Sequence, residues 1–137
     1  MPLREAIAIV LEAYAGANIV DIGFDGSSAT CLYRVKALYL GEMWDGTVDA
    51  DRGVIADGSR LIPLKELMEE DRGKLAALRR VGPGMSEAIM VAEKASSGKA
   101  IGGGLGDDNG KLVFEIFVLS DTGLKKVILE PPKARRR

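Results

Sequence analysis

An internal repeat constrains the fold of this chain more than any other feature of its sequence. Residues 85–119 begin with an apolar-striped helical pattern and continue through a glycine-rich corner into two β-prone runs, and a degenerate copy of this order occupies Leu3–Leu38. A shift of 82 residues (87 minus 5) places Glu5-Ala6-Ile7 on Glu87-Ala88-Ile89. Self-similarity of this kind indicates one supersecondary unit that is used twice.

The first copy predicts one helix followed by strands. Apolar residues at i, i+3 and i+4 spacing form a stripe along one helical face, made of Ala6, Ile7, Val10, Leu11 and Tyr14. Gly16 is suited to end this helix, because glycine readily adopts a positive φ. Alternating and β-branched residues predict strands at 18–24, at 30–40 and from 47–48, with a turn signal at Trp44-Asp45-Gly46.

The second copy predicts the same order of elements. Its helix begins near Ser86, a residue type that is favoured at helix N-caps. Asp108-Asn109-Gly110 is the strongest short hairpin signal in the chain, because Asn-Gly suits a type I′ turn. Strands are expected at 111–119 and 124–129, before two prolines end the pairing.

These patterns predict the α+β class. We expect two repeats of one helix plus a three-stranded antiparallel meander, joined by a helical connector. The first repeat would occupy residues 1–60, the connector 61–84, and the second repeat, with a basic C-terminal tail, 85–137. One such unit is too small for a stable core, so the two units are expected to share one or to lie side by side.

The composition excludes several kinds of chemistry. The chain has no histidine and one cysteine, Cys31, whereas catalytic triads and zinc sites need imidazole or several thiolates. We therefore expect no catalytic residue, no metal and no cofactor. A net charge of -1 gives no general attraction to nucleic acid. No apolar run approaches the roughly 18 residues of a membrane-spanning helix, so no membrane insertion is expected.

Two motifs invite a ligand-binding interpretation, and both fit ordinary structure better. The aspartates at Asp45, Asp49, Asp51 and Asp57 do not fill the ligand positions of an EF-hand loop, so β-turn chemistry is the preferred interpretation. The glycines of Gly102–Gly106 follow a helix, whereas phosphate-binding loops precede one. We expect a loose strand with a bulge there, whose backbone could offer a pairing edge to a peptide.

The aromatic residues are the candidates for protein contact. Trp44, close to Tyr39, has two open roles, which are packing in the core and an exposed interaction anchor. Phe114 and Phe117 lie three apart in a predicted strand and should face opposite sides. One should be core, and the other either covers the connecting helix or marks a protein interface. The candidate contact residues are therefore Trp44, Tyr39 and Phe117.

The sequence at 85–130 resembles the PepSY family. The likeness depends on MSEAIMVAEKASSGKAI, DDNGKLVFEIFVLSDTG and KKVILE, and in the first copy on LREAIAIVLEAYAGANIV, CLYRVKAL and TVDADRGVI. Two features depart from the family pattern, namely the glycines at 102–106 and the EPPKARRR ending. The resemblance implies a small non-catalytic domain of bacterial envelope or secreted proteins, in a family thought to restrain peptidases. It also implies a periplasmic or secreted location after removal of a leader, with a cytoplasmic location as the alternative.

Three hypotheses about function follow. The first is a non-catalytic protein-binding module of the envelope or secreted space, whose partner could be a peptidase that it restrains. The second is a structural domain that assembles with itself, with exposed sheet edges pairing between chains. The third is an enzyme that works with carboxylates alone, for which Asp49 and Asp51 would be the residues to test.

Overall fold

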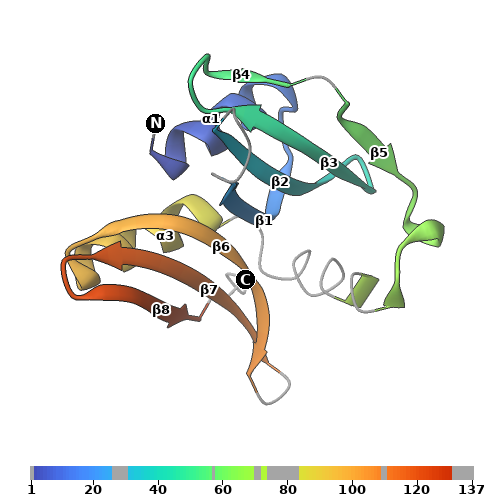
Figure 1. The fold of residues 1–137 in the computed structure, drawn as a ribbon. Coiled ribbons are helices and arrows are strands. Elements are labelled where there is room, and N and C mark those ends of the chain that lie inside the picture. The colour runs from blue at the N-terminus through green and yellow to red at the C-terminus, as the bar shows by residue number, and fades with distance from the viewer. Residues whose placement is uncertain are drawn as a thin grey trace.

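In the part of the chain that the structure describes, one antiparallel β-sheet has two α-helices packed against it (Figure 1). The computed structural model describes residues 2–25, 31–56, 58–69, 72–73, 84–108 and 111–130. Its elements are α1 (Leu3–Ala13), β1 (Asn18–Asp25), β2 (Leu32–Tyr39), β3 (Glu42–Asp49), β4 (Val54–Ile55), β5 (Arg60–Ile62), the 3-10 helix η1 (Leu64–Glu66), α3 (Met85–Ser96), β6 (Lys99–Asp108), β7 (Lys111–Ser120) and β8 (Gly123–Leu129).

All eight strands belong to the same sheet. Their order is β4-β3-β2-β1-β6-β7-β8, and β5 also pairs with β3. Strands β1 and β6 join the N-terminal and C-terminal parts of the chain, because Asp21, Ile22 and Gly23 lie opposite Gly104, Gly103 and Gly102. The described chain therefore has one continuous sheet.

The predicted fold of two repeats, each a helix plus a three-stranded meander, is wrong. The pairing of β1 with β6 merges all the strands into one sheet, and β5 adds a strand that the prediction did not contain. The broader prediction of an α+β protein with an antiparallel sheet is confirmed. Half of the predicted connector, 61–84, lies outside the described residues.

The sequence predicts the end of α1 and the β6–β7 hairpin correctly, and it predicts one turn wrongly. Gly16 has a φ of 86° just after α1, as expected for a glycine that ends a helix. Strands β6 and β7 form the predicted hairpin, with Asp108 opposite Lys111. The predicted turn at Trp44-Asp45-Gly46 is instead the middle of β3, and the chain turns at Leu40-Gly41. Gly46 serves packing there, since a Cβ would lie 2.6 Å from the Trp44 ring.

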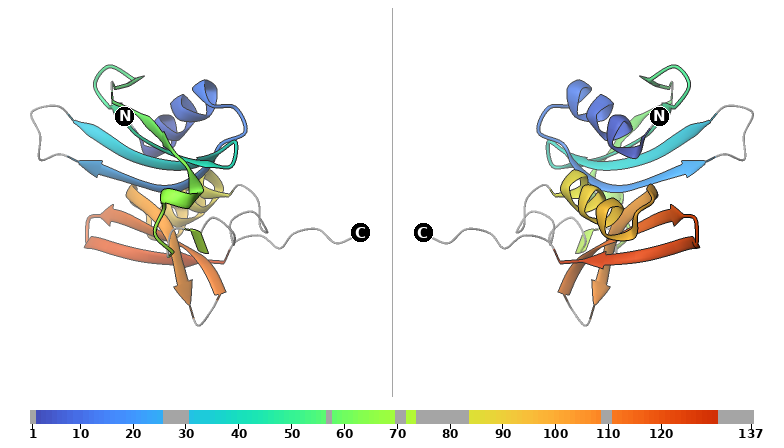
Figure 2. Two further views of the ribbon diagram at one scale, coloured as in Figure 1. Left: turned by 90° about the vertical axis from the view of Figure 1, so that its right-hand side faces the viewer. Right: turned by 90° about the vertical axis from the view of Figure 1, so that its left-hand side faces the viewer.

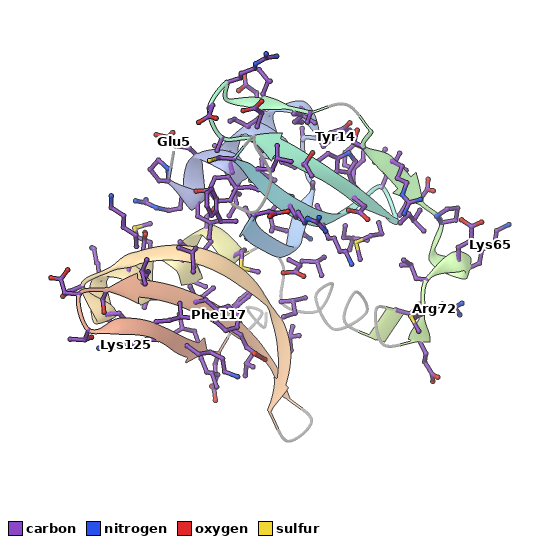
Figure 3. The ribbon with its side chains drawn as sticks, viewed as in Figure 1. Glu5, Tyr14, Lys65, Arg72, Phe117 and Lys125 are labelled. Carbon is purple, nitrogen blue, oxygen red and sulfur yellow. The ribbon has the colours of Figure 1, made fainter. Side chains whose placement is uncertain are left out.

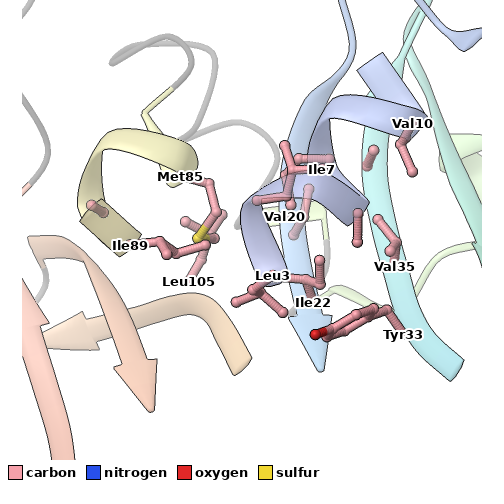
Figure 4. Close-up of a cluster of buried hydrophobic side chains, with 14 of the residues drawn as sticks. Leu3, Ile7, Val10, Val20, Ile22, Tyr33, Val35, Met85, Ile89 and Leu105 are labelled. Carbon is pink, nitrogen blue, oxygen red and sulfur yellow. The ribbon is translucent and has the colours of Figure 1, made fainter. Parts of the chain in front are cut away.

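The core lies between the sheet and the two helices, which cover the same face (Figures 1 and 2). Helix α1 buries Leu3, Ala6, Ile7 and Val10 along the predicted stripe. Helix α3 buries Met85, Ala88, Ile89 and Ala92. Burying one such Leu or Ile side chain contributes about 1.5–3 kcal/mol. These side chains come from both halves of the chain and meet in one cluster (Figure 4). The two helices therefore stabilise the continuous sheet by packing against one face of it.

The structure also bears on membrane insertion. Within the described part of the chain, none of the helices has both the length and the apolar character that crossing a bilayer requires.

Candidate functional site

The candidate site is the face of the sheet opposite the helices, here called the outer face. Side chains alternate between the two faces of a strand, and in β7 Phe114, Ile116 and Val118 are buried toward the helices. Phe117 and Leu119 point the other way and are exposed (Figure 3). The predicted split between Phe114 and Phe117 is therefore confirmed.

Four apolar side chains form a strip on this face over β7 and β8. The register places Leu119 opposite Leu124, Phe117 opposite Lys126 and Ile128 opposite Glu115. The ion pair between Lys126 and Glu115, at 3.4 Å, therefore lies between Ile128 and the other three side chains. The exposed fractions are 37% for Phe117, 52% for Leu119, 61% for Leu124 and 51% for Ile128. We call these four residues the apolar strip. Neighbouring exposed apolar residues of this kind are a feature of interaction surfaces.

A shallow hollow that is lined partly by glycines lies beside the apolar strip. Gly102 and Gly104 of β6 line it together with Asp21, Glu115 and Phe117, and its volume is about 340 Å³. A Cβ on Gly104 would lie 3.2 Å from Oδ1 of Asp21. Because glycine has no side chain, Gly102 and Gly104 leave the surface of the sheet open between the carboxylates of Asp21 and Glu115.

The glycine-rich strand agrees with one prediction and contradicts another. A register shift between Ala100 and Gly102 confirms the expected bulge in a strand. Residues Gly102–Gly104 pair with β1 on one side and with β7 on the other. These glycines therefore have no open edge for a peptide, and that prediction is wrong.

Charged side chains of both signs continue the outer face over β1, β2 and β3. A second hollow of about 650 Å³ is lined there by Asp21, Gly23, Phe24, Asp25, Arg34, Val35, Lys36 and Asp45. Nη2 of Arg34 lies 3.3 Å from Oδ2 of Asp25, and Lys36 lies opposite Asp45. The two hollows share Asp21 and Gly23. The outer face therefore combines the apolar strip, the glycine-lined hollow and a polar region over β1, β2 and β3.

The aspartates near β3 support a turn. Oδ1 of Asp49 accepts hydrogen bonds from the backbone N–H groups of Asp51 and Arg52, at 2.9 and 3.0 Å. This geometry confirms the predicted turn chemistry at Asp49, while Asp57 lies outside the described residues. Across the residues that the structure describes, acidic and thiol side chains nowhere gather in groups of three that could hold a metal ion.

The three residues predicted to contact a partner lie in two different places. Trp44 is 1% exposed, and the centre of its ring lies 5.1 Å from that of Tyr14. Tyr39 is half-buried beside the same Tyr14 ring, also at 5.1 Å. Of the two roles left open for Trp44, the structure therefore supports core packing. Phe117 lies far from this aromatic cluster, on the outer face (Figure 3).

The sequence prediction missed Leu119, Leu124 and Ile128. A signal was present, because the run from Leu112 to Leu119 is apolar at positions that face both sides of the strand. A strand with one solvated face normally alternates apolar and polar residues. The missing alternation indicates that the outer side of β7 is also apolar.

Comparisons with known proteins give a fold likeness and no family. No protein-family model matches the chain, and no curated protein matches it. The crystal structure of a putative lipoprotein from Clostridium difficile 630 is similar, with a TM-score of 0.50 and 19% sequence identity over 97% of this chain and 88% of that chain. At this identity the likeness concerns the fold alone, and the resemblance to PepSY domains stays a prediction.

Proposed function

We propose that this chain is a non-catalytic protein-binding module that contacts its partner through the outer face of the sheet. The observation that carries the proposal is the apolar strip, whose four side chains are between 37% and 61% exposed on one face. Protein interfaces commonly combine an apolar centre with a polar rim. Here the strip is the centre, and the charged residues over β1 to β3 form the rim.

The proposed setting is the bacterial envelope or the secreted space. A structural neighbour is described as a putative lipoprotein. The sequence also resembles PepSY domains, and this resemblance implies a location outside the cytoplasm. Both observations support the same setting.

The resemblance to PepSY domains also supplies the proposed kind of partner, a peptidase that the module restrains. An exposed, partly apolar face suits contact with a folded protein, because such interfaces bury roughly 800 Å² on each partner. Restraint would follow if the partner were held with its active site blocked.

Affinity capture from native envelope and culture fluid tests the proposal. The bait would be the wild-type chain, a Phe117→Asp/Leu119→Asp variant and a Leu40→Asp control, with mass spectrometry as the readout. Leu40 is exposed in the β2–β3 turn, away from the strip, and its φ of 50° is one that Asp tolerates. We expect one stoichiometric partner with the wild-type and control baits, and its loss with the double variant.

A second step tests the restraint of a peptidase. The captured partner is assayed for peptide hydrolysis with and without an equimolar amount of the wild-type chain. We expect lower hydrolysis with the wild-type chain and unchanged hydrolysis with the double variant. A partner that binds all three baits equally would exclude the outer face as the contact surface.

A further inference from the structure

Strand β8 forms one edge of the sheet, and among the described strands none pairs with its other side. It pairs with β7 on one side and is the last strand in the sheet order. At the opposite edge, β3 is covered by the short strands β4 and β5. Among the described strands, β8 is therefore the longest edge, and an open edge can accept a further strand.

A groove between α3 and β8 runs beside this edge. Ala88 and Val91 of α3 line it together with Phe114 and Leu129, and its volume is about 210 Å³. Val91 is 52% exposed. A strand added to β8 would direct alternate side chains toward this groove and the others toward the outer face. The groove is also lined by Glu87 and Glu130, so one face of an added strand would meet apolar side chains flanked by carboxylates. Its other face would meet Ile128 and Lys126 of the outer face.

The sequence of β8 is complementary to itself when two copies run antiparallel. It begins with Gly123 and Leu124, continues with Lys125-Lys126 and then Val127, Ile128 and Leu129, and is followed by Glu130. Antiparallel pairing places the basic start of one strand against the acidic end of the other, and a two-fold axis makes this contact twice.

One register satisfies both the charges and the apolar residues. With Lys126 opposite Glu130 of the second copy, Ile128 faces its own counterpart and Val127 faces Leu129. Opposite charges directly across a strand pair are favourable and like charges are unfavourable. The alternative register with Lys126 opposite Lys126 is therefore disfavoured.

We propose that two copies of this chain associate through their β8 strands, antiparallel, with the two-fold axis at Ile128. The partner is a second copy because the strand and its flanking charges complement themselves. This association goes beyond the proposed binding of another protein, since it uses the edge of the sheet and leaves Phe117 and Leu119 open. It joins the two outer faces into one surface.

Charge reversal tests the register. Sedimentation equilibrium would compare the wild-type chain with Lys126→Glu, Glu130→Lys and the double variant. We expect each single change to raise the dimer dissociation constant about tenfold, because each disturbs two symmetry-related pairs. The double variant should recover wild-type association. Lys126 also lies 3.4 Å from Glu115 in its own chain, so the Glu130→Lys result is the cleaner one. Lys36→Glu, on β2, is the control.

Disulfide trapping tests the position of the axis. In a Cys31→Ser background, Ile128→Cys should cross-link two chains under mild oxidation, because directly opposed residues lie within disulfide range. Lys126→Cys should cross-link far more slowly. A wild-type chain that stays monomeric at every soluble concentration would overturn the proposal, as would faster cross-linking at residue 126 or a double variant that fails to recover. The charge variants at Lys126 and Glu130 leave all four residues of the apolar strip unchanged, so with these variants loss of the other partner would be seen separately.

Discussion

Strand β1 pairs with β2 on one side and with β6 on the other, and the two pairings differ in length and in the side chains that stabilise them. Its contact with β2 extends from Asn18 to Asp25 and includes side-chain pairs, such as the Phe24 and Tyr33 rings with centres 5.3 Å apart. Its contact with β6 is limited to Asp21, Ile22 and Gly23, opposite three glycines. The first contact is a hairpin between neighbours in sequence, and the second joins distant parts of the chain.

The β1–β6 contact depends on packing behind the sheet. A Cβ on Gly103 would lie 3.1 Å from Met85 Sδ, 3.1 Å from Ile116 Cδ1 and 3.8 Å from Ile22 Cγ2. On the outer side, a Cβ on Gly23 would meet nothing within 4 Å. The helix-covered side of this contact is therefore packed with core side chains at Gly103, while its outer side is open at Gly23. The β1–β6 pair thus stabilises the fold on the helix-covered face and borders the glycine-lined hollow on the outer face.

The largest effect is expected from Ile22→Ala, which removes a fully buried side chain between Val35 and Gly103. We expect the free energy of unfolding to fall by about 2–5 kcal/mol, because a cavity remains where the side chain was. Urea denaturation measures this change. Val54→Ala, at a half-exposed position in β4, is the control and should change stability by less than about 0.5 kcal/mol. Equal effects would contradict a shared core.

A smaller effect is expected from Gly103→Ala, which adds a methyl group on the packed side. We expect a loss of about 1–3 kcal/mol, because the neighbouring side chains must move to admit it. Gly23→Ala makes the same chemical change where space is open, and should be neutral or should stabilise by up to about 1 kcal/mol. Thermal unfolding of the two variants measures the difference in stability between them. A similar loss of stability in both would contradict a difference in packing between the two faces.

The smallest effect concerns Tyr33, on the β2 side of β1. Burial raises the pKa of Tyr33 above its usual value, and the nearby Glu5 carboxylate and Cys31 add to the rise. The folded state therefore favours the protonated phenol, and this contribution is complete below pH 10 and is lost as the pH rises through the folded pKa. Between about pH 10 and 12, the wild-type chain should lose stability more steeply than Tyr33→Phe. Parallel pH profiles would contradict this assignment.

The sequence predicted what depends on neighbouring residues. The stripe of α1, the hairpin between Asp108 and Lys111, and the opposite faces of Phe114 and Phe117 all follow from local periodicity and turn chemistry. The pairing of β1 with β6 could not be predicted in this way. Gly102, Gly103 and Gly104 carry no side-chain pattern that would identify the strand opposite them.

The candidate site shows the same division. Phe117 was predicted because its position three residues from Phe114 places it on the other face of the strand. Leu124 and Ile128 join it through cross-strand register, which becomes visible when β7 and β8 are paired. Trp44 was the strongest single candidate by residue type, yet it is buried under α1 beside Tyr14.

Methyl NMR of the chain with its captured partner tests the central claim, which is that the outer face is the binding surface. Side chains of Leu119, Leu124 and Ile128 report on the outer face, and Val91 reports on exposed α3. The proposal predicts that adding the partner shifts the methyl signals of Leu119, Leu124 and Ile128 and leaves Val91 unchanged. Shifts at Val91 with unchanged signals on β7 and β8 would contradict it.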